Sequence, residues 1–369
     1  MTKVTICVGA GGVGKTTVSS IIALERALLG RRVLLITLDP ARRLMDALSL
    51  EEACHEPVKV DIDRLTARAP KENGELFALM PDLKSEWMDF LEDSIHRSDV
   101  RHEITSNHFY RYMVEGLPGA FEIICSHIMF RLMKDGRYDD IILDTPPSSH
   151  SISFFEVPKK ISRVLNQSLF NRLIKSRKSM LFKVTKRIAF LSGGILEKTL
   201  ERIIGSHFLS ELIDFALTID ALYEPLLERT TAMEELLKSQ KTRYVLISRP
   251  TFASVNDCIS VAQALKEQGV GFDELIINQV MPHLDDKAVD DELQYLPRIL
   301  TQEQYETVLA RIARHRRALA DQKGLMDELM GEFGNLNKRV LFQYIGTSDR
   351  IGMMQQLVDD YKNNEMVEE

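Results

Sequence analysis

The chain has 369 residues, of which 44% are hydrophobic, so it can bury one large core or two smaller ones. Its formal net charge of -7 argues against nucleic acid as a partner. The four cysteines are scattered and include no C-x-x-C pair, which excludes a cysteine zinc clasp or a cysteine-held iron–sulfur cluster within one chain. The chain runs directly into an apolar strand pattern, and no apolar run reaches membrane-spanning length. We therefore expect a soluble, cytoplasmic protein without a signal peptide.

A glycine-rich motif lies between a predicted buried strand at 3–8 and a predicted helix at 16–29. Residues 9–16 match G-x-x-x-x-G-K-[ST], the phosphate-binding loop of nucleotide-binding proteins. In such a loop glycines let backbone N–H groups face the phosphates, and the following helix N-terminus adds its positive end. Lys15 is expected to reach the β- and γ-phosphates, and the Thr16 hydroxyl to bind Mg²⁺. The residues expected to contact the nucleotide through the loop are Gly9, Gly11, Gly12, Val13, Gly14, Lys15 and Thr16.

The rest of the chain alternates short apolar runs with helical patterns. The predicted strands are 4–8, 32–38, 140–144, 243–248, 274–280 and 339–345. The predicted helices are 16–29, 83–95, 120–134, 254–268, 301–330 and 349–361. Buried strands separated by helices predict an α/β fold with a doubly wound, mostly parallel sheet. Ligands bind at the carboxyl ends of the strands in such folds, where the glycine motif lies.

The interval 156–240 interrupts this alternation, contains no convincing strand, and is predicted to form several helices, including an apolar-rich one at 207–237. We therefore expect an ATPase-type core from 1–155 and 241–369, with a helical subdomain at 156–240. Residues 159–195 contain ten Lys or Arg and no Asp or Glu, with apolar residues at helical spacing. A basic amphipathic segment can lie on an anionic membrane or hold an acidic partner helix, and it can equally be a subdomain that packs its apolar side inward.

Three polar residues follow predicted strands and fit nucleotide chemistry. Asp39 ends the second strand, where a carboxylate can position or activate the attacking water. Asp144 ends an apolar strand, as does the acidic residue on the Mg²⁺ side of P-loop ATPases. Asn278 could contact adenine through its amide or be a buried structural residue, and either aspartate could instead cap a helix or turn.

A series of motifs in chain order resembles the ArsA-like P-loop ATPase family, that is, the arsenical-pump and tail-anchored-protein-targeting ATPases. The motifs are residues 9–17, 38–41, 117–119, 144–147 with His150, and 278–279. The resemblance implies a homodimeric, Mg²⁺-dependent ATPase that hydrolysis switches between open and closed forms. It assigns water positioning to Asp39, the start of the second switch to Asp144, adenine contact to Asn278 and α-phosphate contact to Thr17.

The chain departs from this family in four ways. Ala10 stands where members usually carry a second loop lysine that reaches the partner's nucleotide, and we hypothesise that Arg42 or Arg43 supplies that charge. The arginines could equally belong to a surface helix face. The zinc-binding cysteine pair of the eukaryotic targeting members is missing, and Cys54, Cys125 and Cys258 have no spacing that predicts arsenite binding. The chain has one loop, as in a single-loop bacterial-type member, whereas arsenite pumps are usually duplicated.

Three functions fit these patterns. The first is an ATP-driven dimeric switch, a homodimer or a heterodimer with a paralogue, whose helical subdomain binds a membrane-protein client. The second is a nucleotide-dependent positioning or scaffold protein that contacts an anionic membrane surface through 159–190. The third is a small-molecule phosphoryl-transfer or ligase enzyme of the same fold.

Overall fold

The computed structural model describes residues 2–38, 43–48, 50, 56–96, 98, 101–102, 105, 120–146, 156, 206–283, 285–344, 350–363 and 365–366. The chain forms two compact units. The sheet unit comprises 1–80, 138–152 and 240–369, and the helical unit comprises 81–137 and 153–239. The boundaries at 155/156 and 240/241 that the sequence suggests stay predictions.

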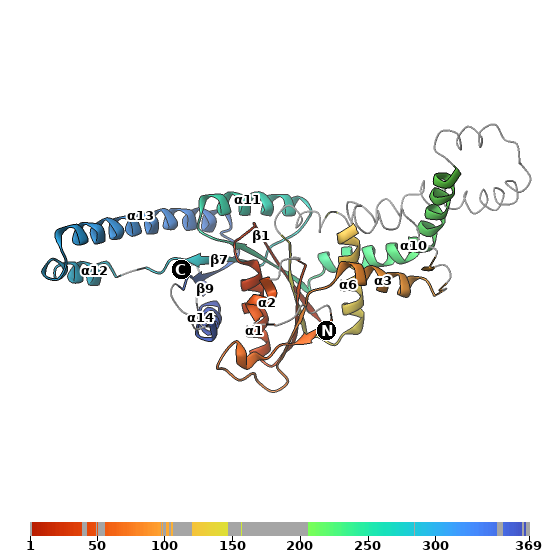
Figure 1. The fold of residues 1–369 in the computed structure, drawn as a ribbon, viewed down its shortest axis with the longest axis horizontal. Coiled ribbons are helices and arrows are strands. Elements are labelled where there is room, and N and C mark those ends of the chain that lie inside the picture. The colour runs from red at the N-terminus through yellow and green to blue at the C-terminus, as the bar shows by residue number, and fades with distance from the viewer. Residues whose placement is uncertain are drawn as a thin grey trace, which may run out of the picture. The chain divides into compact units, whose positions relative to one another are not determined.

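The sheet unit is built on one sheet, in which nine strands of the described residues follow the order β3-β4-β2-β5-β1-β6-β7-β8-β9. Figure 1 labels β1, β7 and β9 of this sheet together with its flanking helices α1 and α11. The short outer pairs β3/β4 and β8/β9 are antiparallel, and all other neighbours are parallel. The strands are β1 (Lys3–Gly9), β2 (Arg32–Thr37), β3 (Val58–Lys59), β4 (Glu75–Leu79), β5 (Asp140–Asp144), β6 (Thr242–Ser248), β7 (Glu274–Val280), β8 (Asn337–Phe342) and β9 (Glu365–Met366). The predicted doubly wound, mostly parallel α/β sheet is confirmed.

The six strands expected from the sequence are all present, whereas β3, β4 and β9 were not expected. Two of these three have only two residues, and β4 is a five-residue run. Short runs carry little periodicity, so their pairing partner decides whether they are strands. For β4 that partner is β2, with the parallel register Arg32↔Glu75 to Ile36↔Leu79.

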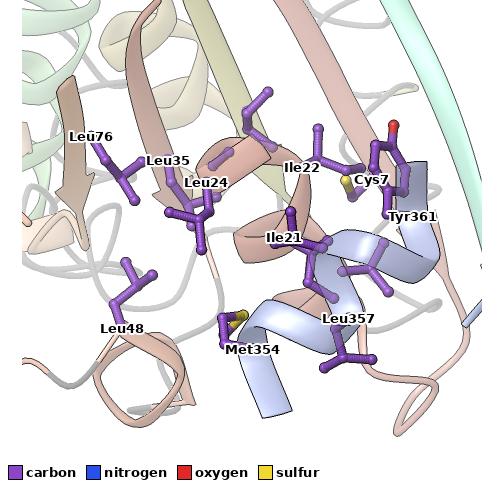
Figure 2. Close-up of a cluster of buried hydrophobic side chains, with 14 of the residues drawn as sticks. Cys7, Ile21, Ile22, Leu24, Leu35, Leu48, Leu76, Met354, Leu357 and Tyr361 are labelled. Carbon is purple, nitrogen blue, oxygen red and sulfur yellow. The ribbon is translucent and has the colours of Figure 1, made fainter. Parts of the chain in front are cut away.

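Alternate residues of the central strands point to opposite faces of the sheet, and each face has its own apolar cluster. On β6 Val245 and Ile247 join one cluster and Leu246 joins the other. The first cluster, shown in Figure 2, packs the sheet against α1 (Lys15–Leu28), α2 (Arg43–Leu48) and α14 (Arg350–Asn363). The second packs it against α11 (Phe252–Glu267) and the end of α13 (Gln302–Glu332). Helices therefore cover both faces, as a doubly wound fold requires.

A buried carboxylate ties α1 to the amino end of β5. Asp140 has no exposed surface and pairs with Arg26 of α1 and with Arg31, which follows that helix. A fully buried carboxylate is tolerated only when it is paired and hydrogen-bonded, so both arginines are needed here. These pairs fix where α1 lies on the sheet, and α1 begins at the glycine loop.

Three shorter elements also lie in the described part of the sheet unit. They are η1 (Ile62–Arg64), α12 (Asp286–Leu293) and η2 (Leu296–Arg298). Arg316 of α13 forms ion pairs with Asp286 and Asp290, so α12 and α13 run side by side. All three of these residues are exposed or half-buried, and the pairs are worth little stability individually.

The helical unit contains α3 (Leu83–Ser94), α6 (Ala120–Asp135) and α10 (Ser206–Lys238). Trp87 and Phe90 of α3 pack edge to face, and Phe90 packs in the same way against His127 of α6. The predicted long apolar-rich helix at 207–237 is confirmed as α10, which contains Pro225. Within the described residues, no helix combines the length and apolar character needed to cross a membrane.

Candidate nucleotide-binding site

The glycine motif lies between β1 and α1, at the centre of the sheet, where β1 is flanked by β5 and β6. Gly12 and Gly14 have φ angles of 78° and 89°, in the left-handed region that favours glycine. A Cβ on Gly14 would lie 2.3 Å from Asn278 Nδ2, and one on Gly9 would lie 2.3 Å from the carbonyl oxygen of Ile247. The loop therefore requires glycine for two reasons, backbone conformation and close approach of neighbouring strands.

The N-terminus of α1 opens directly from this loop. Gly14 is its N-cap and no side chain caps the helix. The first N–H groups of an uncapped helix, together with its dipole, favour an anion. The backbone from Gly11 to Val13 leads into this end, with Gly11 and Gly12 exposed and Val13 buried. The arrangement is that of a phosphate-binding loop.

Lys15 is held against the loop. Its Nζ donates to the carbonyl oxygens of Gly9 and Ala10, at 3.0 Å each, and the residue is only 8% exposed. An ammonium group directed by loop carbonyls is a preorganised charge for phosphate oxygens. Ala10 is 1% exposed, so the position of the missing second lysine is buried in this chain.

The Asp144 side chain, at the end of β5, links β2 and the first turn of α1 by hydrogen bonds. Its Oδ2 accepts from Thr16 Oγ1 at 2.7 Å and from Thr37 Oγ1 at 3.0 Å. The register places Asp144 opposite Cys7 of β1 and Thr37 of β2. This donor set is all oxygen, which suits Mg²⁺. The predicted residues Thr16 and Asp144 are therefore brought together.

Asp144 and Thr145, at the carboxyl end of β5, lie in buried surroundings that hold their side chains in place. Asp144 is 1% exposed, and next to it the Thr145 hydroxyl donates to the carbonyl oxygen of Cys7 at 2.7 Å. Burial raises the pKa of the Cys7 thiol well above its usual range, and Asp144 adds to that effect. Cys7 is therefore a packed apolar residue of the core and no nucleophile.

Asn278 reaches the loop from β7. Its Nδ2 donates to the carbonyl oxygen of Val13 at 2.8 Å, and the residue is 3% exposed. Gln279, the next residue, has a φ of 59°, an unusual conformation for a residue other than glycine. Asn278 thus supports the loop directly, and its expected contact with adenine stays a prediction. Thr17 is half-buried on the first turn of α1.

Thr37 of this site was not expected from the sequence, and Thr145 appeared there only as part of the motif 144–147, without a role of its own. Thr37 is the last residue of β2, and Thr145 follows the last residue of β5. A polar residue at the carboxyl end of a parallel strand is the signal that could have found both. The sequence cannot show which strand ends are neighbours, and that pairing is what gives Thr37 its role.

Several predicted functional residues lie outside the described residues. They are Asp39, Arg42, residues 117–119, Pro147, His150 and the basic segment 159–195. Arg43 opens α2, but only its backbone is described. The water-positioning role of Asp39 and the compensating role of Arg42 or Arg43 stay predictions.

The parallel doubly wound sheet, the glycine loop after β1 and the Thr16–Asp144 pair define a P-loop nucleoside triphosphatase. The family described as Anion-transporting ATPase matches residues 2–312, and the chain belongs to this family. It is therefore an ATPase, and its substrate is ATP.

Curated relatives carry the same assignment. The chain is 26% identical to the ATPase ASNA1 homolog of Babesia bovis over 333 residues, covering 87% of this chain and 81% of that protein. It is 25% identical to the ATPase ASNA1 homolog of Cryptosporidium parvum over 285 residues, 77% of this chain and 67% of that protein. It is also 25% identical to the ATPase GET3 of Malassezia globosa over 278 residues, 74% and 72% of the two chains.

Proposed function

We propose that this ATPase is a Mg²⁺-dependent homodimeric switch, located in the cytoplasm, that couples its nucleotide state to the binding of a membrane-protein client. The helical segment 156–240 is the part that binds the client, with the basic stretch 159–190 as its contact surface. The observation that carries the proposal is the pair of hydrogen bonds from Thr16 and Thr37 to one oxygen of Asp144.

That pair supports a switch because it links the phosphate loop to two other strands. Thr16 lies on the first turn of α1, Thr37 ends β2, and Asp144 ends β5. Any ligand that changes the position of Thr16 or Asp144 therefore acts on the end of β2. Asp39 lies two residues beyond Thr37 in the sequence, so the water-positioning carboxylate follows the same strand.

In the proposed reaction the loop binds and orients ATP. The N–H groups of residues 9–14 and the α1 N-terminus hold the phosphates, and Lys15 neutralises charge on the β- and γ-phosphates. Thr17 contacts the α-phosphate and Asn278 the adenine. Thr16 and Asp144 would hold Mg²⁺, which would neutralise charge on the phosphate oxygens. Asp39 orients the attacking water.

Phosphate release measured at saturating ATP tests the site assignment. We expect Lys15→Ala and Asp144→Asn each to lower kcat by about 100-fold or more, because each removes charge stabilisation or a metal ligand at the reacting phosphate. Asp139→Asn is the matched control, because Asp139 is exposed at the other end of the sheet and differs by the same chemical change. Equal turnover in wild type and Asp144→Asn would exclude Asp144 from the site.

Light scattering with and without Mg²⁺·ATP tests the switch. We expect Asp39→Asn to form a lasting ATP-dependent dimer, because it binds ATP without hydrolysing it, whereas wild type reverts as ATP is consumed. The trapped dimer then serves as bait for the client. A mass that ignores nucleotide in both proteins would contradict the dimeric switch while leaving the ATPase assignment intact.

The compensating arginine is tested separately. If Arg42 or Arg43 replaces the charge that Ala10 lacks, one of the two alanine variants loses turnover and keeps its nucleotide affinity. Unchanged turnover in both variants would exclude compensation by these residues.

A further inference from the structure

The helical unit contains a pocket of 470 Å³ at the place where α3, α6 and α10 meet. Its lining includes Ser94 of α3, Arg131 and Lys134 of α6, and Arg229 of α10. Arg131 and Lys134 are three residues apart, so they share one face of α6. None of these residues belongs to the nucleotide site, which lies in the other unit.

Arg229 is the most buried cation of this pocket, with 7% of its side chain exposed. Its Nε donates to His127 Nδ1 at 3.0 Å, and its Nη1 donates to the carbonyl oxygen of Pro225 at 3.2 Å. The rings of Phe90 and Phe130 lie 5.1 and 5.2 Å from its Cζ. Contacts with α3, α6 and α10 therefore hold the guanidinium group in one position. The two hydrogen bonds use two of the five N–H donors of the group.

Among the described residues, the carboxylates nearest to Arg229 are beyond hydrogen-bonding distance. Glu228 Oε2 lies 3.7 Å from Nη1, and Asp93 Oδ2 lies 3.9 Å from Nη2. Both carboxylates are on the pocket rim, with 63% and 57% of their side chains exposed. Water screens such exposed charges, so they only partly offset a buried cation. Burial accordingly lowers the pKa of Arg229 from its ordinary value.

Two further polar atoms of the lining are buried without a hydrogen-bond partner in the described part of the chain. They are Ser94 Oγ and Arg131 Nε. The other end of Arg131 is engaged, since its Nη2 donates to both carboxylate oxygens of Glu86 at 2.7 and 2.9 Å. An arginine Nε only donates, and leaving a buried donor unsatisfied costs free energy. Among the described residues, the pocket thus has two unsatisfied groups that can donate, the Ser94 hydroxyl and the Arg131 Nε. Its acceptors are the carboxylates of Asp93, Asp135 and Glu228, which offset its three cations in formal charge.

We propose that this pocket binds a small oxyanion, a phosphate or a carboxylate group, as a ligand site separate from the nucleotide site. Arg229 donates to its oxygens from inside the pocket, and Arg131 and Ser94 belong to the same lining. Lys134, which is exposed, adds positive charge at the mouth. The rim carboxylates weaken the attraction, so we expect a dissociation constant of about 1 mM, which is typical of a ligand with few contacts.

The test follows the Nε–H resonance of Arg229 by NMR, assigned with the variant Arg229→Lys. Inorganic phosphate and succinate are titrated separately at constant ionic strength, with Mg²⁺·ADP saturating so that the glycine loop does not contribute. We expect a saturable shift, and the ligand with the lower dissociation constant identifies the preferred group. Ser94→Ala and Lys134→Gln should each raise that constant about threefold to tenfold.

These two variants avoid the buried Arg131–Glu86 pair, so both are expected to fold. Lys238→Gln is the matched control, because Lys238 is an exposed lysine of α10 that pairs with Glu234 and does not line the pocket. An Arg229 signal that stays unchanged at about ten times the expected dissociation constant would overturn the proposal. A shift that Lys238→Gln weakens as much as Lys134→Gln would also overturn it, since the effect would then be non-specific.

Discussion

At the scale of single residues, Gly14 meets two demands at once. Its backbone is left-handed, and its missing side chain leaves room for the Asn278 amide. Gly12 shares only the first demand, because a Cβ there would contact nothing within 4 Å. A substitution at Gly12 therefore tests the backbone conformation alone, whereas a substitution at Gly14 tests the conformation and the close approach of Asn278 together.

We expect Gly14→Ala to lower nucleotide affinity at least about tenfold, because the new methyl group displaces Asn278 from the loop and shifts the α1 N-terminus. Gly12→Ala carries only backbone strain of about 1 kcal/mol, present with and without nucleotide, and should change affinity little. Titration with a fluorescent ATP analogue measures both. Similar affinities for the two variants would show that the Asn278 contact does not shape the loop.

His127 links the stability of the helical unit to pH. It is fully buried, and its pKa is lowered from 6.5 to about 4, first by burial and then by the charge of Arg229. The unfolded chain therefore binds more protons than the folded one between these two values. Stability is present above about pH 6.5 and is lost as the pH falls toward 4.

For this single group we expect a loss of about 2 kcal/mol in the free energy of unfolding between pH 7.5 and pH 5. His127→Gln keeps an acceptor for Arg229 but cannot titrate, so it should lose less stability over the same interval. Urea unfolding of both proteins at the two pH values gives the comparison. Identical losses would mean that folding does not change the pKa of His127.

At the scale of elements, α13 is joined to the end of β7 by one side chain. Gln322 is 7% exposed, and its amide accepts from Met281 N at 2.8 Å and donates to Met281 O at 3.2 Å. Met281 follows β7, the strand that also carries Asn278. The long helix between β7 and β8 is therefore anchored just beyond the residue that contacts the phosphate loop.

Replacing Gln322 by leucine should destabilise the chain by about 1–2 kcal/mol, because both backbone groups of Met281 lose their partner while half-buried. Lys323→Leu, a change at the exposed neighbouring position, should stay within about 0.5 kcal/mol. Chemical denaturation gives both values. If Gln322→Leu unfolds like the control, water replaces the amide and α13 is held by its apolar contacts alone.

At the scale of the whole molecule, the nucleotide site and the single tryptophan lie in different units. Trp87 is on α3 of the helical unit and is 2% exposed, whereas the glycine loop belongs to the sheet unit. Its fluorescence therefore reports on the unit that does not bind nucleotide. A switch requires that nucleotide binding in the sheet unit changes the free energy of the helical unit.

We expect Mg²⁺·ADP to raise the free energy of unfolding measured through Trp87, by up to about 2.7 kcal/mol at 100 times the dissociation constant. The expectation follows from the proposed coupling of nucleotide state to the helical segment. Lys15→Ala, which binds nucleotide poorly, should show no such shift. ADP could leave the unfolding transition measured through Trp87 unchanged and still shift the transition measured by circular dichroism of the sheet. That result would mean that the two units unfold independently.

Several features of this protein are determined by its sequence alone, because they depend on neighbours in the chain. The glycine motif specifies a left-handed, side-chain-free turn that only these residues can form at that point. The apolar runs of β1, β2 and β5 are long enough to predict buried parallel strands. From these two patterns the fold class and the residues Lys15, Thr16 and Asp144 could be predicted, and the series of motifs in chain order carried the resemblance to the ATPase family.

The tertiary structure alone decides which distant groups meet. No spacing in the chain shows that Thr37 bonds to Asp144, that Asn278 supports Val13, or that β4 pairs with β2. The same holds for the Arg229–His127 contact and the pocket beside it. Loop and strand patterns depend on residues that are close in the chain, whereas these contacts join residues that are more than 40 positions apart. The order of the strands and the packing of the helices determine which of these distant residues meet.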